Sequence, residues 1–190
     1  MRRVTVAIDP GVTRQGVVVL DAVAEEDNAA ATFESGIQYS FFTQGCRVTD
    51  LTKEVMLWLS TLDVVGWDSN VHVTLAIETP ILNKKAQNPK TYAFQWRNVQ
   101  CLIDAIPWDV CVEVPNGTAK AALTGDGKAD KKAMVDASPF SCEEFGVVNA
   151  EALADAYAIG LASRELNTTV YANVRELLAC HAGPCVEATF

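Results

Sequence analysis

Residues 4–20 of the chain read VTVAIDPGVTRQGVVVL. Two runs rich in β-branched residues, Val4–Ile8 and Gly16–Leu20, flank a segment that contains Pro10-Gly11. Such runs, joined by a Pro-Gly turn, are typical of a β-hairpin. We therefore expect the chain to begin with two antiparallel strands, with Asp9 at the end of the first.

After this hairpin, strand-like runs alternate with segments whose apolar residues recur at helical spacing. The expected elements are a strand near Thr32–Phe42, a helix over Thr49–Leu62, a strand over Val71–Glu78, a helix over Tyr92–Ile106, a strand over Val110–Val114, and helices over Lys128–Asp136 and Ala150–Leu166. This order favours an α/β fold with a mixed five-stranded sheet flanked by helices on both faces. A length of 190 residues suits one such domain.

The composition is that of a globular protein, with 49% hydrophobic and 21% charged residues. Every apolar run is shorter than the roughly 18 residues of a membrane span, and the basic start lacks the apolar core of a signal peptide. We expect a cytoplasmic protein without a membrane partner, associated with the nucleoid or, if viral, found in the host cytoplasm. The six cysteines form no CxxC pair, and Cys180-His181-x-x-x-Cys185 is half of a zinc motif without its second half, so we expect reduced thiols.

Four acidic residues are placed where such a fold could gather them. Asp9 and Glu78 each end an apolar strand pattern, and Glu151 and Asp155 lie four residues apart, on one face of the last expected helix. Carboxylates at strand ends that face two more on a helix supply the hard oxygen ligands that divalent cations prefer. The pattern predicts a divalent-metal site, a kind of site that cuts phosphodiesters.

The charge is unevenly distributed along the chain. The net charge of −9 argues against nucleic-acid binding over the whole surface, but two segments are basic and could hold a polyanion on one face. The lysines that we expect to contact the phosphates of DNA are Lys84, Lys85 and Lys90 in the first segment and Lys120, Lys128 and Lys132 in the second.

Four motifs follow one another in a single order between about residues 4 and 162. They are Ala7-Ile8-Asp9-Pro10-Gly11 with Gly16, then Ala76-Ile77-Glu78, then Leu123-Thr124-Gly125-Asp126-Gly127-Lys128-Ala129-Asp130-Lys131, and finally Asp155-Ala156-Tyr157-Ala158-Ile159. Together they resemble the RuvC-type Holliday junction resolvases. The glycine-rich third motif is the most specific of the four, whereas Asp-Pro-Gly alone is weak.

The resemblance implies an RNase H-like fold and a homodimer that makes paired nicks in four-way DNA junctions with Mg²⁺ or Mn²⁺. By position, Asp9, Glu78 and Asp155 match the family's metal ligands, while Lys120 and Lys131 match lysines near the DNA and the scissile phosphate. We expect two metal ions per active site, and Lys131 as the residue that offsets charge on the phosphorane. Residues 1–166 would be the nuclease domain and residues 167–190 a C-terminal tail, packed on the domain or loosely attached.

The chain departs from the family at two positions. The family commonly has Asp three residues before the last ligand, where this chain has Ala152, so we assign the fourth catalytic and metal-binding acid to Glu151, with Asn149 as the alternative. Family members often place an aromatic residue three positions after the second acid, where this chain has Ile81. The residues that could open the junction instead are Tyr92, Phe94 and Trp96.

Three alternatives to a strict resolvase follow from the same residues. The first is a broader nuclease for flaps and forks, and the second is a junction-binding module whose catalytic site has weakened, as Ala152 would suggest. The third is a fragment of an actin-like ATPase or sugar kinase, because Asp9-x-Gly11-x-Thr13-x-x-Gly16 resembles the first phosphate loop of those proteins. That fold needs two such domains, for which this chain is too short.

Overall fold

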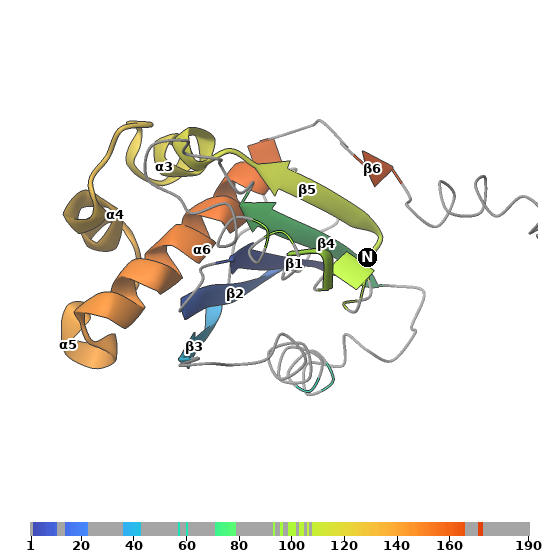
Figure 1. Ribbon diagram of the computed structural model, residues 1–190, viewed down its shortest axis with the longest axis horizontal. Coiled ribbons are helices and arrows are strands. Elements are labelled where there is room, and N and C mark those ends of the chain that lie inside the picture. The colour runs from blue at the N-terminus through green and yellow to red at the C-terminus, as the bar shows by residue number, and fades with distance from the viewer. Residues whose placement is uncertain are drawn as a thin grey trace, which may run out of the picture.

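The computed structural model describes residues 2–10, 14–22, 36–42, 71–78, 108–165 and 171–172, together with scattered positions between 57 and 106. These residues form a mixed sheet of six strands in the order β3-β2-β1-β4-β5-β6 (Figure 1). The strands are β1 (Arg2–Asp9), β2 (Arg14–Ala22), β3 (Gly36–Phe42), β4 (Val71–Glu78), β5 (Val110–Val114) and β6 (Tyr171–Ala172). The predicted α/β class and mixed sheet are confirmed.

The predicted hairpin is the antiparallel pair β1–β2, and β3 extends it on the far side of β2. On its other edge β1 runs parallel to β4, and β4 runs parallel to β5. The predicted count of five strands is one too low, because the short β6 pairs antiparallel with β5. A strand of two residues has no sequence period, and it lies in the segment that we had assigned to the tail.

Four helices are described: α3 (Asn116–Thr124), α4 (Lys131–Ala137), α5 (Cys142–Phe145) and α6 (Val147–Glu165). The sequence predicted α4 and α6 with slightly different ends and missed α3 and α5. Helix α4 begins later than expected because the Asp130 side chain caps it, accepting a hydrogen bond from the amide of Ala133 at 2.8 Å. The helix predicted over Thr49–Leu62 lies almost wholly outside the described residues, and that over Tyr92–Ile106 is described at scattered positions, several of them helical.

The sheet has an apolar core on each face, because side chains along a strand point alternately to opposite sides. In β1, Val4, Val6 and Ile8 belong to one core, whereas Ala7 belongs to the other, which is covered by α6. Val99 and Ile106, from the segment in which a helix was predicted, pack in the first of these cores. The expected helix layer on each face of the sheet therefore agrees with the structure.

Helix α6 lies unusually close to the sheet, since its inner surface is made of small residues. A Cβ atom at Gly16 of β2 would lie only 2.0 Å from the carbonyl oxygen of Ala152 and 3.2 Å from Cβ of Ala156. Gly160 similarly faces Leu20, with 2.6 Å between a Cβ built on Gly160 and Leu20 Cδ1. This close approach explains the glycine that ends the first family-like motif, and it sets the distance between α6 and the strand ends.

None of the helices in the described part of the chain is both long and apolar enough to span a membrane.

Candidate active site

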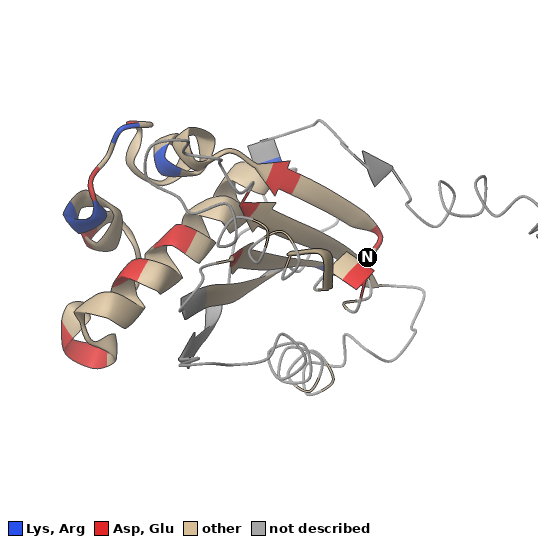
Figure 2. Cartoon of the chain, in the orientation of Figure 1, with Lys and Arg blue, Asp and Glu red and all other residues tan. Residues whose placement is uncertain are grey.

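Asp9 and Glu78 lie side by side at the carboxyl ends of two neighbouring strands. Strands β1 and β4 are parallel, with Ile8 aligned with Ile77, so the residue that follows in each strand reaches the same edge of the sheet. The charge of Glu78 is one of the causes that raise the pKa of Asp9, so the two acids interact. Figure 2 shows acidic residues at these strand ends and on the neighbouring helix α6. The hydrophobic patterns of β1 and β4 thus place both predicted acids as expected.

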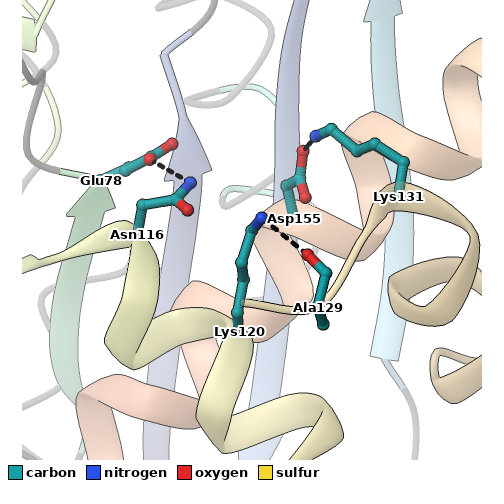
Figure 3. A network of polar contacts seen from close by, with 6 residues as sticks. All are labelled: Glu78, Asn116, Lys120, Ala129, Lys131 and Asp155. Atoms are coloured by element: carbon teal, nitrogen blue, oxygen red, sulfur yellow. Dashed lines mark hydrogen bonds and ion pairs between the residues drawn. The ribbon is translucent and has the colours of Figure 1, made fainter. Parts of the chain in front are cut away.

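Asp155 approaches the same point from α6. It is one of only two polar residues that are buried in the described part of the structure, with 9% of its surface exposed. Its Oδ2 accepts a hydrogen bond from Nζ of Lys131, the first residue of α4, in a charged pair (Figure 3). The Lys131 side chain is half exposed, so the ion pair spans from the interior of the site to its rim.

The electrostatics of Asp9 show that the acids interact strongly. Burial raises the pKa of Asp9 well above its usual value, and the charges of Glu78 and Asp155 and the hydrogen bond with Glu78 raise it further. The charge of Lys131 opposes these effects without cancelling them. The three carboxylates therefore share a site in which negative charge exceeds positive charge.

The same acids also change the pKa of Lys131. Burial acts to lower its pKa, but the hydrogen bond and charge of Asp155, with the charges of Asp9 and Glu151, raise the pKa above its ordinary value. This amine consequently remains an ammonium at neutral pH. The contribution of Glu151 also shows that Glu151 lies within electrostatic range of the site.

The two candidates for the fourth metal ligand, Glu151 and Asn149, differ in their surroundings. Glu151 is partly buried, one helical turn before Asp155 on α6. Asn149 instead donates from Nδ2 to the carbonyl oxygen of Phe145 at 2.8 Å, across the start of α6. The side-chain amide of Asn149 is thus engaged in a hydrogen bond at the start of α6. The assignment of the fourth ligand to Glu151 stays a prediction.

The glycine-rich motif is a compact turn that places Lys131. Gly125 ends α3 with a φ of 79°, a left-handed conformation that favours glycine. A Cβ atom on Gly127 would lie 2.9 Å from the carbonyl oxygen of Gly117, so the turn packs directly on the start of α3. Asp130 then caps α4, which makes Lys131 its first residue. Each of these steps needs a particular residue type, and this requirement explains the specificity of the motif.

The lysines predicted to bind DNA fall into three groups. Lys120 is partly buried and donates from Nζ to the carbonyl oxygen of Ala129 at 2.8 Å, so it ties α3 to the motif (Figure 3). Lys128 is exposed on the turn, and Lys132 is exposed on α4, where it pairs with Asp136 at 2.6 Å. Lys84, Lys85 and Lys90 lie outside the described residues.

Of the aromatic residues considered for opening a junction, only Trp96 is described. It is partly buried and packs against the core on the face of the sheet opposite α6. Tyr92 and Phe94 lie outside the described residues.

Asn116 is a site residue that the sequence did not predict. Its Nδ2 donates a hydrogen bond to Glu78 Oε1 at 2.7 Å, from the first turn of α3 (Figure 3). A signal was available, because Asn116 follows the end of β5 by two residues and β5 is the parallel neighbour of β4. Two of the acids and the amide border one small hollow, lined by Glu78, Asn116, Ala119, Lys120, Met134, Asp155 and Ile159.

The chemistry of this donor set fits a divalent metal ion. Carboxylate oxygens are hard ligands of the kind that Mg²⁺ and Mn²⁺ take, and the charges of Glu78 and Asp155 add to the effect of burial in raising the pKa of Asp9. In their present positions, however, no three His, Cys, Asp or Glu side chains among the described residues are grouped so that they could hold a metal ion. The pairing of Asp155 with Lys131 accounts for part of this, since an oxygen that a metal would take faces the ammonium.

The fold as a whole is similar to that of a solved structure. Over 84% of this chain and 92% of the other, the structure of Thermus thermophilus RuvC superposes with a TM-score of 0.52 at 20% sequence identity. The chain has the RuvC fold. A second structure, of T. thermophilus RuvC in complex with a Holliday junction substrate, matches 84% of this chain and 91% of that chain at 20% identity, with a TM-score of 0.48. No protein-family model and no curated protein sequence matches the chain.

The RuvC fold agrees with the resemblance seen in the motifs. At 20% identity the structural likeness concerns the fold, and the roles of individual residues have to be argued from this chain. The residues that carry the resemblance in sequence, Asp9, Glu78, Lys131 and Asp155, are those that the fold brings to one place.

Proposed function

We propose that this protein is a divalent-metal-dependent endonuclease that nicks and resolves four-way (Holliday) DNA junctions. The observation that carries the proposal is the meeting of Asp9, Glu78 and Asp155 with Lys131 at the strand ends of a RuvC fold. Three carboxylates in excess over their counter-charge suit a cation, and a neighbouring ammonium suits a phosphate.

The catalytic step would be hydrolysis of a phosphodiester. Asp9, Glu78 and Asp155, with Glu151 as the fourth ligand, would hold two Mg²⁺ or Mn²⁺ ions, which supply an activated water and stabilise the leaving oxygen. Lys131 sits on the solvent side of Asp155 and is half exposed, so its ammonium can reach a phosphate at the rim of the site. There it would offset the negative charge that develops on the phosphorane.

The substrate would be held mainly through its backbone. Figure 2 shows lysines on α3, on α4 and on the turn between them, on one side of the acidic strand ends. Of these, Lys128 and Lys132 are exposed and suited to phosphate contacts, and Lys120 lines the hollow beside Glu78. We extend the phosphate-binding role to Lys84, Lys85 and Lys90 on the basis of their sequence alone. Symmetric nicking of a four-way junction would require two sites, and hence a homodimer.

Two observations favour a different function, that of a junction-binding module with a weakened active site. Ala152 takes a position where the family commonly has an acid, and Asp155 is paired with Lys131 rather than grouped with two other acids in a metal-binding arrangement. Such a module would bind four-way junctions and leave them intact. The two functions share the fold and differ in a single measurable property, cleavage.

The deciding experiment is a cleavage assay on a synthetic four-way junction with labelled strands. We expect Mg²⁺ or Mn²⁺ to support paired, symmetric nicks, with much slower cutting of a linear duplex of the same sequence. Flap and fork substrates in parallel would separate a strict resolvase from a broader nuclease. ATP turnover would instead indicate the kinase-like alternative.

The variants Asp9→Asn, Glu78→Gln and Asp155→Asn should abolish cleavage while the junction is still bound. Glu143→Gln is the matched control, because Glu143 is an exposed acid on α5 outside the site. Full cleavage by the first three variants would refute the assignment of the site. Binding without cleavage by the unmodified protein, with every divalent ion tried, would establish the junction-binding module.

A further inference from the structure

Asn116 reaches the proposed metal site from the start of α3, which follows a strand that supplies none of the acids. Strand β5 ends at Val114, which is aligned with Glu78 of β4. The chain then turns through Pro115 into α3, and this turn brings Asn116 over the end of β4. Its Nδ2 lies 2.7 Å from Glu78 Oε1, in a partly buried contact between residues 38 positions apart.

This side chain is not used to begin its own helix. Asparagine is a preferred capping residue, because its side chain can accept hydrogen bonds from the free amides of the first turn. In α3, Pro115 occupies the cap position without any side-chain hydrogen bond, and the amides of Thr118 and Ala119 both bond to the carbonyl oxygen of Pro115. The Asn116 amide group is thereby left to bond across the sheet to Glu78.

A neutral donor of this kind can orient a carboxylate without neutralising it. A hydrogen bond to a carboxylate is short and directional, so the bond from Asn116 fixes one oxygen of Glu78. A lysine at this position would compete with a metal ion for the negative charge, whereas an aliphatic residue would leave Glu78 free to rotate. Asn116 also lines the hollow that Glu78 and Asp155 border.

We propose that Asn116 is a positioning residue that holds the Glu78 carboxylate in the orientation needed to bind the divalent metal ion. This inference rests on the proposed function for the presence of a metal and adds a residue that was not among the sequence predictions. Outer partners that orient metal ligands typically contribute about 10- to 100-fold to metal affinity or to activity. We expect an effect of that size on metal affinity, with no effect on junction binding.

The first measurement uses the full-length protein without DNA. Thermal unfolding is followed over a titration of MnCl₂, and the Mn²⁺ concentration at half-maximal stabilisation is compared between variants. Asn116→Leu keeps approximately the shape of the side chain and removes the donor, so its midpoint should rise about 10- to 100-fold. Asn116→Gln retains an amide donor and should recover a large part of the affinity. Thr118→Ala, on the same turn of α3, is the control and should match the unmodified protein.

A second measurement separates positioning from folding and from DNA binding. Junction binding in EDTA should be unchanged in all variants, and unfolding in EDTA should show no more than the small loss of one hydrogen bond in Asn116→Leu. Cleavage by Asn116→Leu should recover as Mn²⁺ is raised. If Asn116→Leu does not fold, Asn116→Ala and Asn116→Gln take its place in the same titration.

The outcomes also distinguish the inference from the proposed function. A raised Mn²⁺ midpoint in Asn116→Leu supports the inference even if no DNA substrate is cut, in which case the proposed function alone fails. Three results would overturn the inference about Asn116. The Mn²⁺ midpoint could be unchanged in Asn116→Leu, or Thr118→Ala could lose as much affinity as Asn116→Leu. The third result is an unmodified protein that binds no Mn²⁺.

Discussion

The close contact between β2 and α6 makes Gly16→Ala the most informative single substitution. A methyl group at this position would lie 2.0 Å from the carbonyl oxygen of Ala152, whereas real Cβ atoms are essentially never found nearer than 3.0 Å to another atom. The shortfall is 3.0 − 2.0, or about 1 Å, and the obstacle is helix backbone, which cannot turn aside as the end of a side chain can. Helix α6 must therefore move away from the sheet by about 1 Å.

The cost follows from the size of this displacement. Overpacking a well-packed core costs about 1–3 kcal/mol, and a backbone clash with no room for a rotamer change belongs at the upper end, about 3 kcal/mol. For a domain of this size each kcal/mol lowers Tm by about 2–4 °C, so we expect a fall of about 6–12 °C. Because α6 carries Asp155, the same displacement separates it from Asp9 and Glu78, and a misplacement of about 1 Å can cost about 100-fold in rate.

The assay pairs thermal unfolding, followed by circular dichroism, with junction cleavage under single-turnover conditions. Gly160→Ala is the matched control, since its nearest obstacle, at 2.6 Å, is Cδ1 at the end of the Leu20 side chain and not backbone. Replacing glycine within a helix gains about 0.5–1 kcal/mol. We expect Gly160→Ala to change Tm by no more than about 3 °C. A Gly16→Ala variant that melts within about 2 °C of the unmodified protein and cuts at its full rate would refute the reasoning.

Three further predictions concern the charged groups of the site. Asp9→Asn should raise Tm in EDTA at neutral pH. The raised pKa of Asp9 means that the folded protein holds the carboxyl proton more tightly than the unfolded chain does. Stability is therefore lost as pH rises from about 3.9, the ordinary pKa of this carboxyl group, through its pKa in the folded protein. The gain should shrink as pH falls towards the ordinary value, and a variant less stable than the unmodified protein at neutral pH would contradict this. Lys131→Met should lower the free energy of unfolding by about 1–2 kcal/mol in EDTA, because buried Asp155 loses its partner, and Mn²⁺ should restore the lost stability. Urea unfolding with and without Mn²⁺ tests this. An equal loss of stability in the two conditions would show that no metal replaces the ammonium. Asp130→Ala should cost about 1 kcal/mol through loss of the α4 cap, whereas an unchanged urea midpoint would show that the cap contributes nothing.

The elements that were predicted correctly are those whose patterns are local. The apolar runs of β1 and β4 and the long apolar series of α6 follow from the sequence, because a buried strand or helix face extends over several residues. Helix α3 was missed because it has only nine residues with a weak apolar pattern, and β6 because it has two. Short elements of this kind are stabilised by the helices and strands that pack against them, and the local sequence pattern contains no information about those contacts.

The candidate site divides in the same way. The sequence by itself determined which acids end β1 and β4, which acids share a face of α6, and that a glycine-rich turn precedes Lys131, since each depends on residues close together in the chain. Only the tertiary structure decided that Lys131 pairs with Asp155, that Lys120 holds the turn at Ala129, and that Asn116 donates to Glu78. These contacts join residues 9 to 38 positions apart, and they depend on how closely α6 packs on β2 and how β5 lies beside β4. That packing is a property of all the neighbouring side chains together, which no single stretch of sequence contains.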